Sequence, residues 1–266
     1  MLTFATKSEK NGVHAMSDND MQSLGKDFHK GPLYRDYVAQ VVKKKGARNY
    51  MEIGVREGYC ISGIDVPSIG VDPFFQFACN PIAGKKALFL FQMGSDEFFR
   101  DYDPRNLFGG NTVDVTFLDG LHQFEFLLRD FINTEKVSSN NSVILLDDCL
   151  PVNVEMTERV HVPSERKDKE LSGWWTGDVW KVVSILRKYR PDLKLSPFDT
   201  TPTGNVMVTN LNPQSTLLSD SYYDIISEFR DVSLTQAGLI EFMDINQPIE
   251  TSKMLSNFDF SLYFSP

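Results

Sequence analysis

Acidic side chains stand directly after two largely apolar stretches of the sequence. Residues 115–118 end at Asp119, and residues 143–146 end at the pair Asp147 and Asp148. A short apolar run bounded by polar residues is typical of a buried strand in a parallel sheet. Because parallel strands end at one edge, where open α/β sheets bind ligands, we expect these carboxylates to lie at a ligand site.

Three carboxylates that meet at one edge predict a positively charged partner. Two unit charges about 4 Å apart repel by roughly 4 kcal/mol at an effective dielectric constant near 20. A divalent cation held by Asp119, Asp147 and Asp148 would remove this repulsion, and oxygen ligands favour Mg²⁺ over zinc. Such a cation, together with a nearby base, would activate a hydroxyl group. Acids that bind substrate hydroxyls without a metal are the alternative.

His122 is the best candidate for a general base. It follows Asp119 by three residues, at the start of a predicted helix. An alcohol is a poor nucleophile until its proton is withdrawn, which a positioned histidine can do. We therefore expect His122 and Asp119 to be the catalytic residues. A histidine at this place can equally cap the helix or pack in the core.

Strand-like and helix-like segments alternate along the chain, which predicts a doubly wound α/β fold. We expect a mostly parallel, seven-stranded Rossmann-like sheet with helices on both faces. The predicted strands are residues 49–55, 68–72, 87–91, 113–118 and 142–146, with 193–197 and 204–209 as a closing pair. The predicted helices are residues 32–45, 59–64, 96–102, 122–137, 178–189, 221–229 and 235–242.

A glycine turn follows the first predicted strand. Gly54 and Gly58 would let a ligand approach the backbone and a helix N-terminus closely. The acid Glu52 precedes the first glycine and Arg56 separates the two, so this is not the G-x-G-x-x-G dinucleotide motif. Asp72 ends the second predicted strand, where a carboxylate can accept both hydroxyls of a ribose. A tight turn and a solvated strand end are the alternative.

A long charged segment, residues 150–175, follows the fifth predicted strand, and segments of this length are usually lids or unstructured. Trp174 and Trp175 end it, and Asp178 and Trp180 follow. We assign Trp174, Trp175 and Asp178 to the substrate, because tryptophan stacks on sugar rings. Helix capping by Asp178 and tryptophan packing are the alternative. We expect a mixture, in which Asp178 caps its helix and at least one tryptophan faces the cleft.

The first glycine turn resembles motif I of the class I S-adenosylmethionine-dependent methyltransferases. In that family the motif holds the methionine end of the cofactor, and the acid of the next strand holds its ribose. The resemblance implies that Glu52, Gly54 and Gly58 line the methionine side and that Asp72 binds the ribose. Arg56 departs from the family pattern.

Two further cofactor contacts follow from the same resemblance. The segment that contains Ser95 and Asp96 stands where the family places its adenine contact. Asp119 is also expected to border the cofactor.

The spacing of the acids resembles that of the metal-dependent O-methyltransferases of the catechol and macrolide-sugar types. Those enzymes carry an Asp after strand four and an Asp-Asp or Asp-Asn pair after strand five, as Asp119, Asp147 and Asp148 do here. There the metal binds two oxygens of a vicinal diol and lowers the pKa of the one to be methylated. The macrolide-sugar enzymes have another Asp where this chain has Leu121.

A wider resemblance, over about residues 50–210, is to the methyltransferase domain 24 group. It rests on residues 117–122, 128–130, 148–149 and 176–181. Many members have His where this chain has Asp147. The resemblance implies an S-adenosylmethionine-dependent O-methyltransferase for a hydroxyl of a sugar or glycosylated small molecule. A nucleotide-sugar-modifying enzyme and a non-catalytic binding module are the alternatives.

The expected organisation has three parts. Residues 1–31 form a polar arm without assigned chemistry, residues 32–210 a methyltransferase domain with its lid at about 150–175, and residues 211–266 a helical and aromatic extension. The extension ends in Phe258, Phe260, Tyr263 and Phe264. Such an aromatic end can cover the sheet or a second subunit, so we expect a monomer or a homodimer.

The composition limits the partners. A net charge of -9 and a pI near 5.0 give no basic surface for nucleic acid. No apolar run reaches the roughly 18 residues of a membrane span, and no signal peptide is recognisable, so we expect a cytoplasmic protein without a membrane partner. The three cysteines, odd in number and without paired spacing, argue against disulfides and a zinc site.

Overall fold

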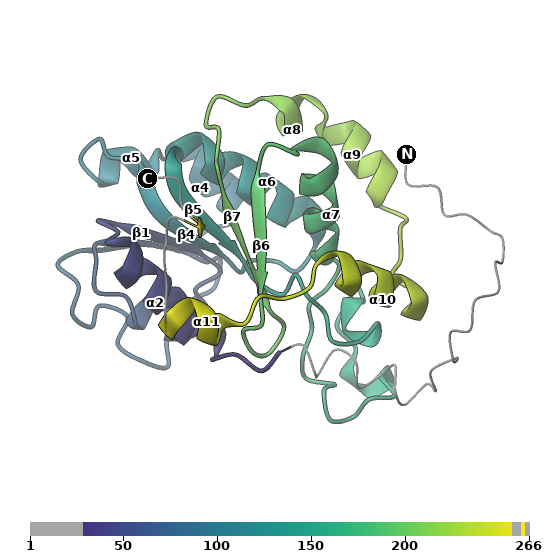
Figure 1. Ribbon diagram of the computed structural model, residues 1–266. Helices are drawn as coiled ribbons and strands as arrows, with labels where there is room; N and C mark the ends of the chain where they lie inside the picture. Colours follow the sequence, from purple (N-terminus) through teal and green to yellow (C-terminus); the bar gives the residue numbers. More distant parts are fainter. Residues whose placement is uncertain (1–28, 257–261, 264–266) are drawn as a thin grey trace.

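The protein is built around one seven-stranded sheet in the order β3-β2-β1-β4-β5-β7-β6 (Figure 1). The computed structural model describes residues 29–256 and 262–263. Its strands are β1 (Tyr50–Ile53), β2 (Ser68–Val71), β3 (Leu88–Phe91), β4 (Val113–Leu118), β5 (Ser138–Leu146), β6 (Lys194–Phe198) and β7 (Asn205–Thr209). The predicted strands are all present.

The sheet is mostly parallel. Strands β1 to β5 pair in parallel, whereas β7 is antiparallel to both β5 and β6. The predicted closing pair therefore forms, and its second strand joins the sheet. Because β4 and β5 are direct neighbours, their carboxyl ends meet, as the sequence predicts.

Strand β5 begins at Ser138, before the predicted start at residue 142. Ser138 pairs with Val113 across an irregularity in the register. The segment 138–141 is polar, and Asn140 and Asn141 are exposed, so it lacks the apolar pattern of a strand. Only its backbone pairing with β4 reveals it.

Helices cover both faces of the sheet, as predicted. Their bounds are α2 (Tyr34–Lys45), α3 (Tyr59–Ser62), α4 (Ser95–Asp101), α5 (Pro104–Leu107), α6 (Phe124–Val137), α7 (Trp180–Tyr189), α8 (Leu217–Asp220), α9 (Tyr222–Phe229), α10 (Gln236–Ile245) and α11 (Thr251–Ser256). The short α5, α8 and α11 were not predicted. Among the described helices, none is long and apolar enough to cross a membrane.

Successive side chains of a strand point to opposite faces of the sheet. Alternate residues of each strand therefore pack in two separate hydrophobic cores. Met51 and Ile144 pack with α4, α6, α7, α9 and α10 on one face. Tyr50 and Val143 pack with α2 and α3 on the other, where Met254 of α11 joins them. Figure 1 shows α2 and α11 together on that face.

The predicted C-terminal extension contributes to the sheet core. Ile225, Phe229 and Phe242 of α9 and α10 are buried in the same cluster as β4 and α6. The predicted domain boundary at residue 210 stays a prediction. Tyr263 packs on Phe198, with ring centroids 5.6 Å apart. The predicted polar arm, up to residue 28, and the aromatic residues Phe258, Phe260 and Phe264 lie outside the described residues.

Candidate active site

A cavity of about 890 Å³ opens at the carboxyl edge of strands β1 to β5. Such an edge is where α/β sheets bind ligands. All but one of the predicted site residues line it: Glu52, Gly54, Gly58, Asp72, Ser95, Asp96, Asp119, His122, Asp147, Asp148, Trp174 and Trp175. The exception is Asp178.

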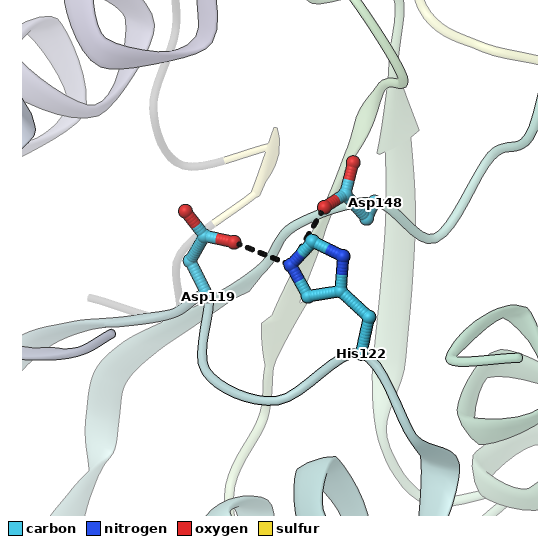
Figure 2. A group of neighbouring side chains, drawn as sticks. All are labelled: Asp119, His122 and Asp148. Atoms are coloured by element: carbon cyan, nitrogen blue, oxygen red, sulfur yellow. Dashed lines mark ion pairs between the residues drawn. The ribbon is translucent and has the colours of Figure 1, made fainter. Parts of the chain in front are cut away.

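Asp119, His122 and Asp148 form a close cluster in the wall of this cavity (Figure 2). His122 Nε2 lies 3.4 Å from Asp119 Oδ1 and 3.2 Å from Asp148 Oδ2. One potential ligand atom from each of the three residues lies within 4.8 Å of the other two. Two carboxylates and one imidazole nitrogen are a donor set that can bind a divalent cation.

Trp175, at the end of the segment 150–175, fixes the orientation of the His122 ring. His122 Nδ1 lies 2.6 Å from the carbonyl oxygen of Trp175, which can only accept a hydrogen bond. The Trp175 ring stacks on the imidazole at 5.0 Å. Because Nδ1 donates its proton to that carbonyl, Nε2 is the nitrogen that can take up a proton or bind a metal.

Asp148 and Asp147 are each held by a side chain near the β6–β7 turn. Asp148 has a left-handed backbone, with φ 56°, and Thr203 Oγ1 donates to its Oδ1 at 2.5 Å. Asn205 Nδ2 donates to Asp147 Oδ1 at 2.6 Å. The sequence does not predict these roles of Thr203 and Asn205. Nothing in the sequence distinguishes these turn residues from ordinary ones.

The structure brings His122 to Asp119 and Asp148, and it leaves Asp147 outside this group of ligand atoms. Asp147 still lines the cavity. Burial, followed by the charges of Asp119 and Asp148, raises the pKa of Asp147 well above its usual value. The predicted metal role of Asp147 stays a prediction.

Glu52 and Asp119, which also line the cavity, have raised pKa values as well. Burial raises the pKa of Glu52 to about 8, although Tyr50 donates a hydrogen bond of 2.6 Å to it. Burial also raises the pKa of Asp119 to about 6, against the hydrogen bond from His122. Tyr34, which no sequence motif predicts as a site residue, lines the cavity, and its ring stacks on that of Phe117 with centroids 5.8 Å apart.

The glycine turn packs the end of β1 against the end of β4. Gly54 has φ 92°, and a Cβ added to it would lie 1.8 Å from the carbonyl oxygen of Asp119. Asp72 ties the same turn to the end of β2. It accepts from the backbone N–H of Arg56 at 2.9 Å and from that of Phe74 at 2.7 Å. Each carboxylate oxygen keeps a lone pair for a further donor.

Trp174 and Trp175 line the cavity, whereas Trp180 is buried against Phe242. Trp175 lies between His122 and His161, with the second ring at 5.6 Å. Its Nε1 donates to the carbonyl oxygen of Glu158 at 2.5 Å. The segment 150–175 is thus folded over the cluster.

Asp178 has a structural position outside the cavity lining, which differs from its predicted contact with the substrate. Its Oδ1 accepts from the backbone N–H of Phe124 at 3.0 Å, and its Oδ2 pairs with Arg159 and with Lys181, the latter at 2.9 Å. It therefore caps α6 rather than the helix that follows it. Both carboxylate oxygens are engaged in these contacts, and the predicted substrate role of Asp178 stays a prediction.

Comparison with known proteins finds solved structures that are distantly similar to this chain. No family model matches the sequence, and no curated protein matches it. Similar solved structures include an O-methyltransferase from Bacillus cereus in complex with SAH, with 13% identity, 74% of this chain and 92% of that chain covered, and a TM-score of 0.45. The O-methyltransferase TomG from Streptomyces achromogenes, in complex with SAM, shares 14% identity, with 74% and 92% covered and a TM-score of 0.47.

An SAH-bound methyltransferase from Podospora anserina shares 12% identity, with 74% and 89% of the two chains covered and a TM-score of 0.45. With TM-scores below 0.5 and identities below 15%, these likenesses carry no conclusion about this chain.

The pKa of His122 is expected to be about 9 in the protein without a bound cation. Burial lowers it, but the charge of Asp148 and the hydrogen bond and charge of Asp119 outweigh burial. Since this value lies above the ordinary 6.5, protonated His122 stabilises the fold fully below pH 6.5, and this contribution is lost as the pH rises through about 9.

Titration of the His122 ring by NMR measures this value. Asp148→Asn should move the pKa of His122 down, because it removes the largest contribution that raises it. Asp101→Asn, at an exposed position, should leave it unchanged. An ordinary pKa near 6.5 in the unmodified protein would contradict the described cluster.

Proposed function

We propose that the protein is an S-adenosylmethionine-dependent O-methyltransferase that acts on a hydroxyl group of a sugar or glycosylated small molecule. The observation that carries the proposal is a single cavity with two chemically different parts. Asp72, an acid that can accept hydrogen bonds from the hydroxyls of a ribose, lies at the end of β2. The cluster of Asp119, His122 and Asp148 lies at the ends of β4 and β5.

The strand order supports this division of the cavity. Along the carboxyl edge the sequence of strand ends is β2, β1, β4, β5, so Asp72, Gly54, Asp119 and Asp148 follow one another in space. An extended methyl donor with its ribose at Asp72 would cross the glycine turn of β1. Its positively charged sulfonium would then lie near Asp119, where a carboxylate favours it.

A divalent cation fits the acidic end of the cavity. Asp119 and Asp148 would hold it, with either His122 or Asp147 as a third protein ligand. When bound, it would lower the pKa of the acceptor hydroxyl group. Neutralising the carboxylates also removes the repulsion between Asp119 and Asp148, which are both close to His122 Nε2.

His122 can accept the proton that the acceptor hydroxyl group must lose. When Asp147 rather than His122 is the third ligand, deprotonated His122 Nε2 is free to accept the proton of the acceptor hydroxyl group, and Asp119 and Asp148 stabilise the imidazolium that forms. The oxygen then attacks the methyl carbon, and the sulfur keeps the electron pair of the broken bond. The anchoring of Nδ1 on the Trp175 carbonyl keeps Nε2 in place for this transfer.

The proposal of a sugar-like acceptor rests on the tryptophans beside the cluster. Trp174 is 41% exposed and lines the cavity, and Trp175 packs on His122. Flat aromatic side chains stack on sugar rings. Trp174→Ala would remove such a platform without touching the His122 cluster.

Binding of S-adenosylhomocysteine, measured by calorimetry, tests the donor half of the proposal. Asp72→Asn is expected to weaken this binding by about tenfold, because a charged acceptor for the ribose hydroxyls becomes neutral. Asp65→Asn, at an exposed position outside the cavity lining, is the matched control and should bind as the unmodified protein does.

These binding measurements distinguish a methyltransferase from a nucleotide-sugar-modifying enzyme. Thermal unfolding of both variants shows whether Asp72→Asn disturbs the turn, since Asp72 also accepts two backbone hydrogen bonds. No binding of S-adenosylhomocysteine to the unmodified protein would refute the proposed function. Greater stabilisation by nucleotide sugars than by S-adenosylhomocysteine would favour a nucleotide-sugar-modifying enzyme.

A further inference from the structure

Arg166 is a buried cation inside the segment 150–175 and outside the cavity lining. The residue is only 2% exposed. Its Nη1 donates to the carbonyl oxygens of Leu171 at 3.4 Å and Ser172 at 3.3 Å, and also to that of Trp174. One guanidinium group therefore binds three backbone carbonyls near the end of the segment.

Stability alone does not explain an arginine at this position. Among the described residues, its Nε and Nη2 have no hydrogen-bond partner, and the ion pair with Glu158 is long, at 3.7 Å from Nε to Oε2. Burying a charge that is so incompletely paired is costly, and an apolar side chain of similar size is often as stable. What the guanidinium does provide is a donor for one particular arrangement of the backbone.

That backbone leads directly to the His122 ring. Trp174, whose carbonyl binds Arg166, precedes Trp175, whose carbonyl oxygen lies 2.6 Å from His122 Nδ1. The Trp175 ring also stacks on the imidazole, with centroids 5.0 Å apart. The position of the Trp174 carbonyl therefore determines where both contacts to His122 are made.

His161 ties the Trp175 ring to the same guanidinium. The His161 ring is nearly parallel to that of Trp175, at an interplanar angle of 2° and a centroid distance of 5.6 Å. Its Nε2 lies 3.0 Å from the Ser172 carbonyl oxygen, which also accepts from Arg166. The aromatic stack and the backbone contact thus share one anchor.

The backbone of His122 is held by other contacts. The N–H of Asp178 donates to the His122 carbonyl at 3.3 Å, and a Cβ added to Gly177 would lie 1.7 Å from the same oxygen. The segment also has an apolar cluster of its own, separate from the two sheet cores, formed by Val152, Met156 and Leu171. Loss of Arg166 would therefore release the His122 ring and leave its backbone and the sheet in place.

We propose that Arg166 is a positioning residue that orients the His122 ring through the backbone of Trp174 and Trp175. By fixing the hydrogen bond at Nδ1, it directs Nε2 toward the two carboxylates shown in Figure 2. The use of this orientation, to take up a proton or to bind a cation at Nε2, rests on the proposed function. Arg166 itself takes no part in methyl transfer.

NMR of the protein with ¹⁵N-labelled histidine, without any ligand, tests this role through the exchange of the His122 Nδ1 proton with water. Arg166→Met should speed this exchange by about tenfold or more, because the hydrogen bonds of a charged donor are lost. Arg166→Lys keeps a charged donor for part of the carbonyls and should give an intermediate rate. Lys167→Met, an exposed change in the same segment, is the control and should leave the rate unchanged.

The amide proton of Asp119, which is bonded to the Ile53 carbonyl within the sheet, is the internal reference. Its exchange should be the same in all variants. A merely structural role of Arg166 would speed both protons by the same factor and would overturn the proposal, as would an Nδ1 proton that is unprotected in the unmodified protein.

An unchanged Nδ1 rate in Arg166→Met would overturn the proposal as well. If that variant does not fold, Arg166→Lys decides, and a rate equal to that of the unmodified protein counts against the proposal. Because no ligand is present, the result does not depend on the proposed function, which fails separately if S-adenosylhomocysteine does not bind.

Discussion

Asp148→Asn is expected to weaken Mn²⁺ binding by about 100-fold or more, measured by calorimetry with the metal alone. Loss of a group that only supports a metal ligand typically costs 10- to 100-fold in affinity, so loss of a charged ligand should cost at least as much. Asp148 Oδ2 lies 3.2 Å from His122 Nε2 and within the group of ligand atoms that also includes Asp119.

Thr203→Val tests the support of this ligand separately. Thr203 Oγ1 donates to Asp148 Oδ1, so its loss frees the carboxylate to rotate. We expect roughly 10-fold weaker Mn²⁺ binding, which is less than for Asp148→Asn. Asp101→Asn, exposed on α4, should not change Mn²⁺ binding. Mn²⁺ binding that survives Asp148→Asn, or none to the unmodified protein at millimolar metal, would refute the metal site.

The same titration separates the two possible donor sets. If His122 is the third ligand, His122→Ala should weaken Mn²⁺ binding far more than Asp147→Asn does, and Mn²⁺ should bind more tightly than Mg²⁺, since imidazole suits transition metals. If Asp147 is the third ligand, as the sequence predicts, the order of the two variants reverses. Three carboxylates would also bind Mg²⁺ well.

The sequence predicts the edge of the sheet at which the acids lie, because alternating strands and helices leave few topologies. It does not predict which acids face one another. Asp147 and Asp148 are adjacent, and neighbouring side chains at a strand end point in different directions. Asp147 therefore turns to Asn205, while Asp148 turns to His122.

The other residues of the site are brought there by contacts between parts of the chain that are distant in sequence. Thr203 reaches Asp148 only because β7 inserts between β5 and β6, and Trp175 reaches His122 only because the lid folds back. Neither contact leaves a local pattern in the sequence. The sequence predicts that Asp178 caps the helix that follows it, whereas its capping partner is the distant Phe124 at the start of α6.

Gly54→Ala is expected to lower the free energy of unfolding by about 3 kcal/mol or more, measured by urea denaturation without any ligand. The left-handed backbone of Gly54, with φ 92°, disfavours any side chain. The added Cβ would also lie 1.8 Å from the Asp119 carbonyl oxygen and 2.8 Å from the Gly120 nitrogen. These are backbone atoms, so the ends of β1 and β4 would have to separate.

Gly173→Ala is the matched control. Gly173 also lines the cavity, yet a Cβ there would meet nothing within 4 Å, and its φ lies outside the left-handed range. Its free energy of unfolding should change by no more than about 0.5 kcal/mol. A similarly small change in Gly54→Ala would contradict the close packing of β1 on β4.

This measurement also decides what the glycine turn is for. A glycine needed only to admit a ligand would give a Gly54→Ala variant that is stable but fails to bind S-adenosylhomocysteine. If the glycine is needed for the backbone contact, the Gly54→Ala variant loses stability even without ligand. Asp119, whose N–H donates to the Ile53 carbonyl at 2.9 Å, is then displaced as well. We expect the second result, with Mn²⁺ binding weakened as well, because a side chain at Gly54 would push the Asp119 backbone away and so move the Asp119 carboxylate relative to His122.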